Sequence, residues 1–261
     1  MKNSVKLLTI FLILLAAIAI SAQTNSKEEL IEKGKESAKK GYLQYNLGKF
    51  LEAHEIFEKA YNENKTDLLP LYYITSIDYK ILEMSMHSGG DSLFNKYYEP
   101  ALKNAEILIN DKNFSADGKI LAAAIYMMKI ATSPMSAVTL SSKIHTLLDE
   151  AQSINPENPY SFVIRGMMKF STPAMFGGSY EDALKNFSVA VKLFENDENT
   201  NNNSIWGYIE ALTWTGRAQE KLNNDEAARF TYKKALGVEP EYGWVKYELL
   251  PKLEDKLANS K

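Results

Sequence analysis

The sequence predicts an all-α protein built from stacked helix hairpins, and three observations lead to that prediction. First, alanine, an aromatic residue four positions on and a second alanine three positions later recur along the chain, in Ala53-Phe57-Ala60, Ala183-Phe187-Ala190 and Ala228-Tyr232-Ala235. Offsets of four and seven residues place all three side chains on one helical face. Second, clusters of Gly, Pro and Asn separate the apolar stretches, as turns between helices require. Third, no segment shows a convincing alternation of period two, so no sheet is expected.

Two weaker copies of the pattern lie between the strong ones, and together the five copies divide the chain into units. The weaker copies are Tyr98-Leu102-Ala105 and Ile144-Leu148-Ala151. The copies start at positions 53, 98, 144, 183 and 228, and each unit is long enough for two helices. Pro100 inside one copy predicts a late helix start or a kink there.

The predicted hairpins span approximately 28–63, 66–110, 114–154, 157–196 and 202–238. A capping helix with one apolar face is expected at 241–258, where Pro251 would kink or divide it.

The repeat resembles the tetratricopeptide repeat (TPR) family. The last unit carries that family's glycine, alanine, aromatic, alanine and proline in register, at Gly216, Ala228, Tyr232, Ala235 and Pro240. Gly41 and Gly166 take the glycine position in the first and fourth units. The period is nearer 45 residues than the family's ~34, which keeps HEAT-type repeats of ~40–47 residues as the structural rival. The alanine and aromatic signature favours a TPR-like α-α superhelix of about five hairpins plus the cap.

The first 22 residues have the pattern of a secretory signal peptide. Lys2 and Lys6 precede an apolar run at 7–20, and small residues end at Ala22. We expect cleavage after Ala22 and a helical repeat domain at 23–261, with an uncleaved N-terminal anchor as the alternative. Because the chain has no cysteine, it cannot be a lipoprotein. The absence of disulfides in an exported chain of this size favours a bacterial Sec-type signal, and a periplasmic or secreted location.

Composition argues against several classes of function. With 30 basic and 33 acidic residues the net charge is −3, which does not suit a nucleic-acid partner. His54, His87 and His145 lack the spacing of metal ligands, so no metal site and no cofactor are expected; His54 is expected to be a surface or groove residue. No Gly-x-Ser-x-Gly nucleophile motif and no Gly-Lys-Ser/Thr phosphate loop is present. We therefore expect no catalytic residues and no enzymatic activity.

The resemblance to TPR proteins implies that the first helix of each hairpin lines a concave surface. Carried onto this chain, the family's groove positions are Tyr42, Tyr45, Tyr160, Val163, Met167, Phe170, Glu210, Thr213 and Arg217. Helical periodicity places Trp206 and Trp214 on the same face as Glu210 and Arg217. The alternative is that these side chains pack against a neighbouring hairpin or the cap.

The connection at 171–179 contains an apolar Met175-Phe176 pair, which makes Phe176 a further candidate binding residue. The alternative is that Phe176 packs back onto its own hairpin. The Pro-x2-Phe-Gly-Gly turn in this connection is also similar to TPR-type accessory proteins of periplasmic TRAP transporters.

These observations predict a binding or scaffold protein of the bacterial envelope that takes a protein or peptide partner in its concave groove. The alternative is an accessory component of a solute transporter, of the TRAP-associated type, that binds a small apolar ligand. Membrane contact is expected only through an uncleaved signal segment. The identity of the partner and the oligomeric state stay open at this stage.

Overall fold

The computed structural model describes residues 27–88, 90–196 and 207–259, and it confirms the all-α prediction. Every regular element within these ranges is helical. The predicted signal peptide at 1–22 lies outside the described residues. None of the described helices combines the length and the apolar content that crossing a bilayer requires.

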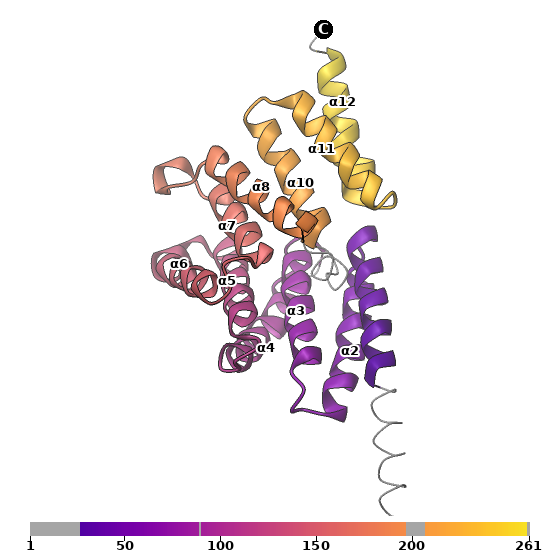
Figure 1. The fold of residues 1–261 in the computed structure, drawn as a ribbon, viewed down its shortest axis with the longest axis vertical. Coiled ribbons are helices and arrows are strands. Elements are labelled where there is room, and N and C mark those ends of the chain that lie inside the picture. The colour runs from indigo at the N-terminus through magenta and orange to yellow at the C-terminus, as the bar shows by residue number, and fades with distance from the viewer. Residues whose placement is uncertain (1–26, 89, 197–206, 260–261) are drawn as a thin grey trace, which may run out of the picture.

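The helices follow one another as antiparallel pairs (Figure 1). Their bounds are 27–44 and α2 (Leu47–Glu63), α3 (Leu69–Ser88) and α4 (Gly90–Ile109), α5 (Ser115–Thr132) and α6 (Ala137–Ile154), α7 (Pro159–Ser171) and α8 (Tyr180–Asn196), and α10 (Gly207–Lys221) and α11 (Asp225–Val238). A wide helical turn (Val245–Leu249) and α12 (Leu250–Asn259) follow. We call 239–259 the cap.

Each signature aromatic packs against a glycine of the paired helix. A Cβ atom on Gly166 would lie 2.4 Å from the ring of Phe187, and one on Gly216 would lie 2.4 Å from the ring of Tyr232. In the first hairpin the partner of Phe57 is Gly34, at 2.5 Å, whereas Gly41, at the family's glycine position, lies against the ring of Phe50, at 3.0 Å. The rings therefore occupy the space that a larger side chain would need, and the two helices can approach closely.

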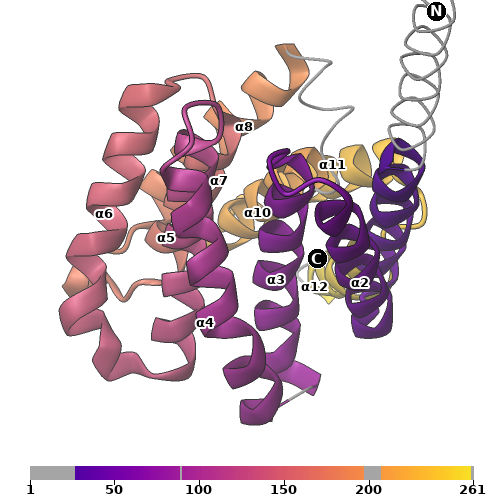
Figure 2. The same cartoon turned by 90° about the horizontal axis from the view of Figure 1, so that it is seen from below.

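The first hairpin contacts the C-terminal cap, so the row of stacked hairpins closes on itself and does not form an open arc. Figures 1 and 2 both place the N-terminal hairpin beside the C-terminal helices. Tyr42 and Tyr242 stack with ring centroids 5.1 Å apart, and Lys39 forms an ion pair with Glu239. Gly243 also lies against the carbonyl group of Leu43.

Helix α3 lies at the centre of this closed row and is buried on almost every face from Pro70 to Ser85. Its neighbours α2, α4 and α5 cover three sides. From the remaining side α7 reaches it through Met167, whose sulfur lies 3.7 Å from the hydroxyl of Tyr79, and α10 reaches it through Glu210. A helix that is covered all round belongs to a core, so α3 fills much of the concave space between the hairpins.

Burial of α3 also explains His54, which was expected at the surface or in the groove. His54 on α2 is instead largely buried against α3, where its Nδ1 lies 2.7 Å from Oδ1 of the fully buried Asp78. Burial raises the pKa of the Asp78 carboxyl, although His54 acts in the opposite direction. Burial alone would lower the pKa of His54, but Asp78 outweighs it and raises that pKa. The histidine thus supplies the partner that a buried carboxyl group needs.

The two prolines expected to disturb helices behave differently. Helix α4 begins at Gly90, ten residues before Pro100, so the late start is wrong and the proline lies inside the helix. In the cap, Pro251 follows the first residue of α12 and the wide turn Val245–Leu249 comes directly before it. The helical conformation runs without a break from 243 to 259, so Pro251 does not divide the cap helix. Because proline has no N–H to donate to the preceding turn, the helix widens just before it.

We predict that Gly216→Ala lowers the free energy of unfolding by about 1–3 kcal/mol, because the new methyl group overlaps the ring of Tyr232. Gly237→Ala in the same hairpin is the matched control. A Cβ on Gly237 meets nothing within 4 Å, so its better helix propensity should raise stability by up to about 1 kcal/mol. Urea denaturation measures both variants. Equal effects of the two substitutions would contradict the packing described here.

Candidate functional site

A buried ion-pair cluster joins the second hairpin to the fifth at the centre of the concave side. Lys80 on α3 is only 2% exposed, and its Nζ donates to Oε1 of Glu210 on α10 at 2.7 Å. It also donates to Oε2 of Glu83, one turn further along α3, at 3.0 Å. Lys80 and Glu210 are 130 residues apart in the chain. Their contact therefore holds α10 of the fifth hairpin against α3 of the second.

Burial and mutual attraction act in opposite directions on these groups. Burial lowers the pKa of Lys80, but Glu210 and Glu83 outweigh it, and the pKa of the lysine stands well above its ordinary value. Burial raises the pKa of Glu210; Lys80 opposes this rise and the charge of Glu83 adds to it. Lys80 is therefore a permanent cation held between two carboxyl groups, and not a proton donor or acceptor near neutral pH.

Tyrosine rings surround this cluster. The Nζ atom of Lys80 lies 4.8 Å from the ring centroid of Tyr79 and 5.5 Å from that of Tyr42, within the range of cation–π attraction. The hydroxyls of Tyr42 and Tyr242 are 3.3 Å apart. Burial raises the pKa values of Tyr242, Tyr42 and Tyr79 far above the ordinary range of a phenol. All three phenols stay neutral.

Two hollows open on either side of Glu210. The first, of about 20 Å³, lies between the 27–44 helix, α3 and the cap, and its lining includes Tyr45, Glu83 and Trp244. The second, of about 30 Å³, lies between α3, α5, α7 and α10, and its lining includes Asp117 and Tyr160. Glu210 lines both of them, so the ion-pair cluster forms the partition between the two hollows.

An aromatic cage encloses Arg217 where α7, α10 and the cap meet. The guanidinium carbon of Arg217 lies 4.2 Å from the ring centroid of Trp214, 5.0 Å from that of Phe170 and 5.1 Å from that of Trp244. Within the described part of the chain it forms no ion pair. Burial lowers its pKa, yet a guanidinium keeps its charge in proteins. The cage therefore holds a cation whose N–H groups are available to an acceptor.

The predicted groove residues fall into three places. Tyr42, Tyr45 and Glu210 line the first hollow. Tyr160, Val163 and Glu210 line the second, and Met167 lies beside it against Tyr79. Phe170, Trp214 and Arg217 form the cage with Trp244.

Three further candidates differ from this group. Thr213 is fully buried, and its hydroxyl donates to the carbonyl of Ile209 in the same helix at 2.7 Å. Its hydroxyl proton is therefore not available to a ligand. Phe176 lies apart from the hollows and is 73% exposed, so it does not pack back onto its hairpin. Trp206 lies outside the described residues.

Sequence reasoning overlooked several charged residues of the site, chiefly Lys80, Glu83 and Asp117. A usable signal was present, because Asp78, Lys80 and Glu83 are the only charged residues in the largely apolar stretch of 69–85. A helix that is apolar on every face is buried, and charges within it require partners elsewhere. Over 27–88, 90–196 and 207–259 no three potential metal ligands converge.

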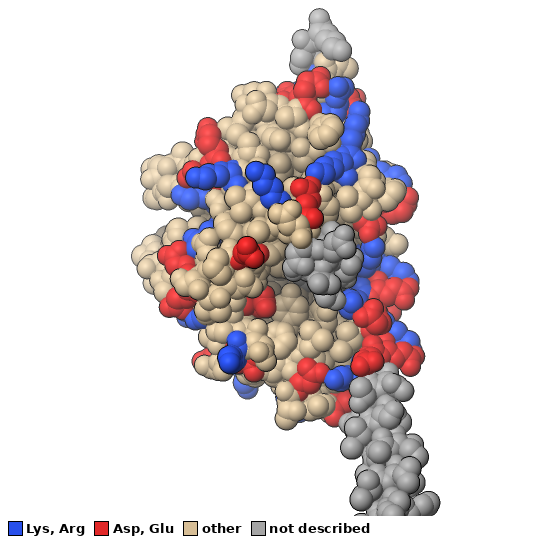
Figure 3. All heavy atoms as spheres, viewed as in Figure 1, with Lys and Arg blue, Asp and Glu red and all other residues tan. Residues whose placement is uncertain are grey.

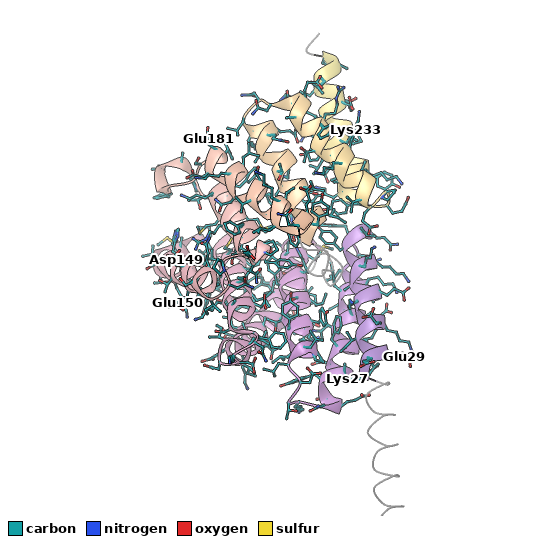
Figure 4. All side chains as sticks on the ribbon, viewed as in Figure 1. Lys27, Glu29, Asp149, Glu150, Glu181 and Lys233 are labelled. Atoms are coloured by element: carbon teal, nitrogen blue, oxygen red, sulfur yellow. The ribbon has the colours of Figure 1, made fainter. Side chains whose placement is uncertain are left out.

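Charged side chains of both signs are mixed over the face shown in Figure 3, without a large region of one sign. Figure 4 shows labelled charged side chains such as Glu29, Asp149 and Glu181 on the outside of the row. The exposed charges on this face therefore do not mark a binding surface. The buried charges of Lys80, Glu83 and Glu210 are the ones that form a defined cluster.

No protein-family model and no curated protein sequence matches the chain. Two solved structures are similar to it. TTC0263, a thermophilic TPR protein of Thermus thermophilus, is 19% identical, with a TM-score of 0.54 over 87% of this chain and 97% of that one. The HusA haemophore of Porphyromonas gingivalis is 18% identical, with a TM-score of 0.58 over 75% of this chain and 94% of that one. The TPR-like superhelix predicted from the sequence is thereby confirmed as the fold.

We predict that Lys80→Met lowers the free energy of unfolding by about 3–5 kcal/mol, because it leaves the buried carboxylate of Glu210 without its cation. The double variant Lys80→Met/Glu210→Met should recover most of this loss, since it removes both buried charges. Chemical denaturation followed by circular dichroism measures all variants.

The control is Lys33→Met, which breaks the exposed pair with Glu29 and should leave the midpoint of denaturation nearly unchanged. A double variant as unstable as the sum of its two single variants would refute the importance of the pair.

Proposed function

We propose that this TPR-like chain is an exported, non-catalytic binding protein that holds a segment of a protein partner against α7, α10 and the cap in the bacterial envelope. Stacked helix hairpins present long surfaces, and proteins of this architecture typically act as interaction scaffolds. The signal-like pattern of residues 1–22 supports export.

The observation that carries the proposal is the cage around Arg217. Trp, Tyr and Arg are the residues that dominate binding energy at protein interfaces, and here one Arg meets two Trp rings and one Phe ring. A guanidinium without an acidic partner favours a carboxylate, which it can bind through two parallel hydrogen bonds. The partner segment would therefore offer a carboxylate next to an apolar side chain.

The central charges support a binding role over a catalytic one. Lys80 is engaged by Glu210 and Glu83, and the surrounding phenols stay neutral because their pKa values are raised. A general acid or base needs a pKa close to the working pH and access to a substrate. Lys80 has neither property, so the cluster serves to fix the positions of α3 and α10.

A second candidate is a small planar apolar ligand, in the role of an accessory component of a solute transporter. The similarity to the HusA haemophore favours it, together with the aromatic rings of Phe170, Trp214 and Trp244 around Arg217. Such a ligand would lie against the aromatic rings and place an anionic substituent on Arg217.

We expect Arg217→Met to reduce recovery of the envelope partner at least about tenfold, because the variant keeps the apolar stem but loses the charged hydrogen bonds. The exported protein serves as bait in a native envelope extract, and quantitative mass spectrometry compares the captured proteins. Arg229→Met, at a partly exposed arginine of α11, is the matched control. Thermal melting of both variants separates loss of binding from loss of folding. Identical recovery by wild type and Arg217→Met would overturn the proposal.

The second candidate predicts a different outcome in two measurements. Native mass spectrometry of the purified protein should show a bound small molecule, and titration with haemin should quench the fluorescence of Trp214 and Trp244 with saturation. The protein-partner proposal predicts neither result. Haemin quenching that is unchanged in Arg217→Met would argue against the cage as the site of such a ligand.

A further inference from the structure

We propose that one edge of the row docks on an anionic lipid bilayer. This edge, here called the loop edge, consists of residues 133–138, which are the α5–α6 connection and the first two residues of α6, and residues 172–179 between α7 and α8. It is separate from the Arg217 cage and does not depend on the function proposed above.

The loop edge carries the most exposed large apolar side chains of the described residues. Their exposed fractions are 83% for Met175, 81% for Val138, 80% for Met135 and 73% for Phe176. Since α5–α6 and α7–α8 are consecutive antiparallel hairpins, their connections lie at the same end of the stack (Figure 2). Four solvent-exposed apolar side chains on two neighbouring connections are costly in water unless another phase covers them.

A basic cleft lies directly behind these apolar tips, between α6, α7 and α8. It has a volume of about 350 Å³, and its lining includes His145, Arg165, Lys169 and Lys185 together with one acidic residue, Asp182. Its apolar lining is Phe162, Met168 and Val189. The cleft therefore combines cations with an apolar floor, as an amphipathic anion requires.

Two contacts link the cleft to the tips and leave donors for a ligand. Lys169 donates through Nζ to the carbonyl of Gly177 at 3.0 Å, directly after Phe176. Arg165 donates through one terminal nitrogen to Asp149 at 2.6 Å. Its Nε atom is buried and has no partner in the described part of the chain. A buried donor without an acceptor indicates that something outside the chain completes the site.

Cations outnumber acids in the cleft itself. Its lining carries Arg165, Lys169 and Lys185 against Asp182, whereas the whole stretch 129–185 is neutral, with five basic and five acidic residues. Asp149 on α6, labelled in Figure 4, neutralises Arg165, and Asp182 lies 3.5 Å from Lys169. With both acids counted, the three cations of the cleft keep one net positive charge, which attracts anionic headgroups.

Shape favours a lipid surface over a protein partner. Met175 and Phe176 stand largely exposed on a short turn between two helices, from which they can enter a fluid interface. Apolar side chains that insert at the headgroup boundary, with cations next to them, are the usual combination for peripheral membrane binding. In this arrangement the tips enter the bilayer while phosphate groups accept hydrogen bonds from Arg165, Lys169 and Lys185.

Vesicle sedimentation tests the proposal with the exported protein, all variants being compared in the same N-terminal form. Wild type should bind vesicles of phosphatidylglycerol and phosphatidylcholine (about 3:7) at least about tenfold better than pure phosphatidylcholine vesicles. Met175→Ser/Phe176→Ser should reduce that binding at least about fivefold, and Lys185→Glu should reduce the preference for the anionic lipid. Because these side chains are largely exposed, the melting temperature should not change.

The matched control is Phe230→Ser, since Phe230 on α11 is 72% exposed but lies outside the loop edge. It should bind vesicles as wild type does, and so should Arg217→Met. An equal loss in Phe230→Ser, or no preference for anionic vesicles, would overturn the proposal. So would a dimer in gel filtration that Phe176→Ser disrupts, because the tips would then be covered by a second copy of the chain.

Discussion

The buried ion pair between Lys80 and Glu210 is the constraint on which the rest of the arrangement depends. A lysine that is 2% exposed is tolerated only when carboxyl groups surround it, and the nearest suitable partner besides Glu83 comes from the fifth hairpin. The pair therefore requires α10 to approach α3, and this approach brings the cap against the first helix. The two hollows and the cage around Arg217 exist because these helices are held in that relation.

The fold could be predicted largely from local packing rules. Alanine and ring-bearing residues at fixed offsets, as in Ala183 and Phe187, define the helix faces, and glycines opposite the rings let the paired helices approach. These features act within one hairpin, so they can be read from a short window of sequence. The glycine contacts of the first hairpin required the structure, because Gly34 and Gly41 are seven residues apart and lie on the same face of the first helix. Gly34 packs on Phe57, and Gly41 packs on Phe50.

The candidate site could be predicted only in part, because it depends on contacts between distant hairpins. Arg217 and Trp214 were found because they share a face of one helix that is not required for packing within its hairpin. Lys80 was missed because its partner is 130 residues away. Thr213 was included from the family pattern, although its short hydroxyl side chain binds the carbonyl one turn earlier in its own helix.

The closure of the row by Tyr42, Tyr242 and the ion pair of Lys39 with Glu239 has a consequence for how such a chain can evolve. An open solenoid can gain or lose a repeat at little cost, because each unit contacts only its neighbours. Here the insertion or deletion of one unit would separate the terminal helices and leave the central charges without their partners. Diversification of this architecture is therefore confined to the connecting loops and to side-chain replacement at a constant number of repeats.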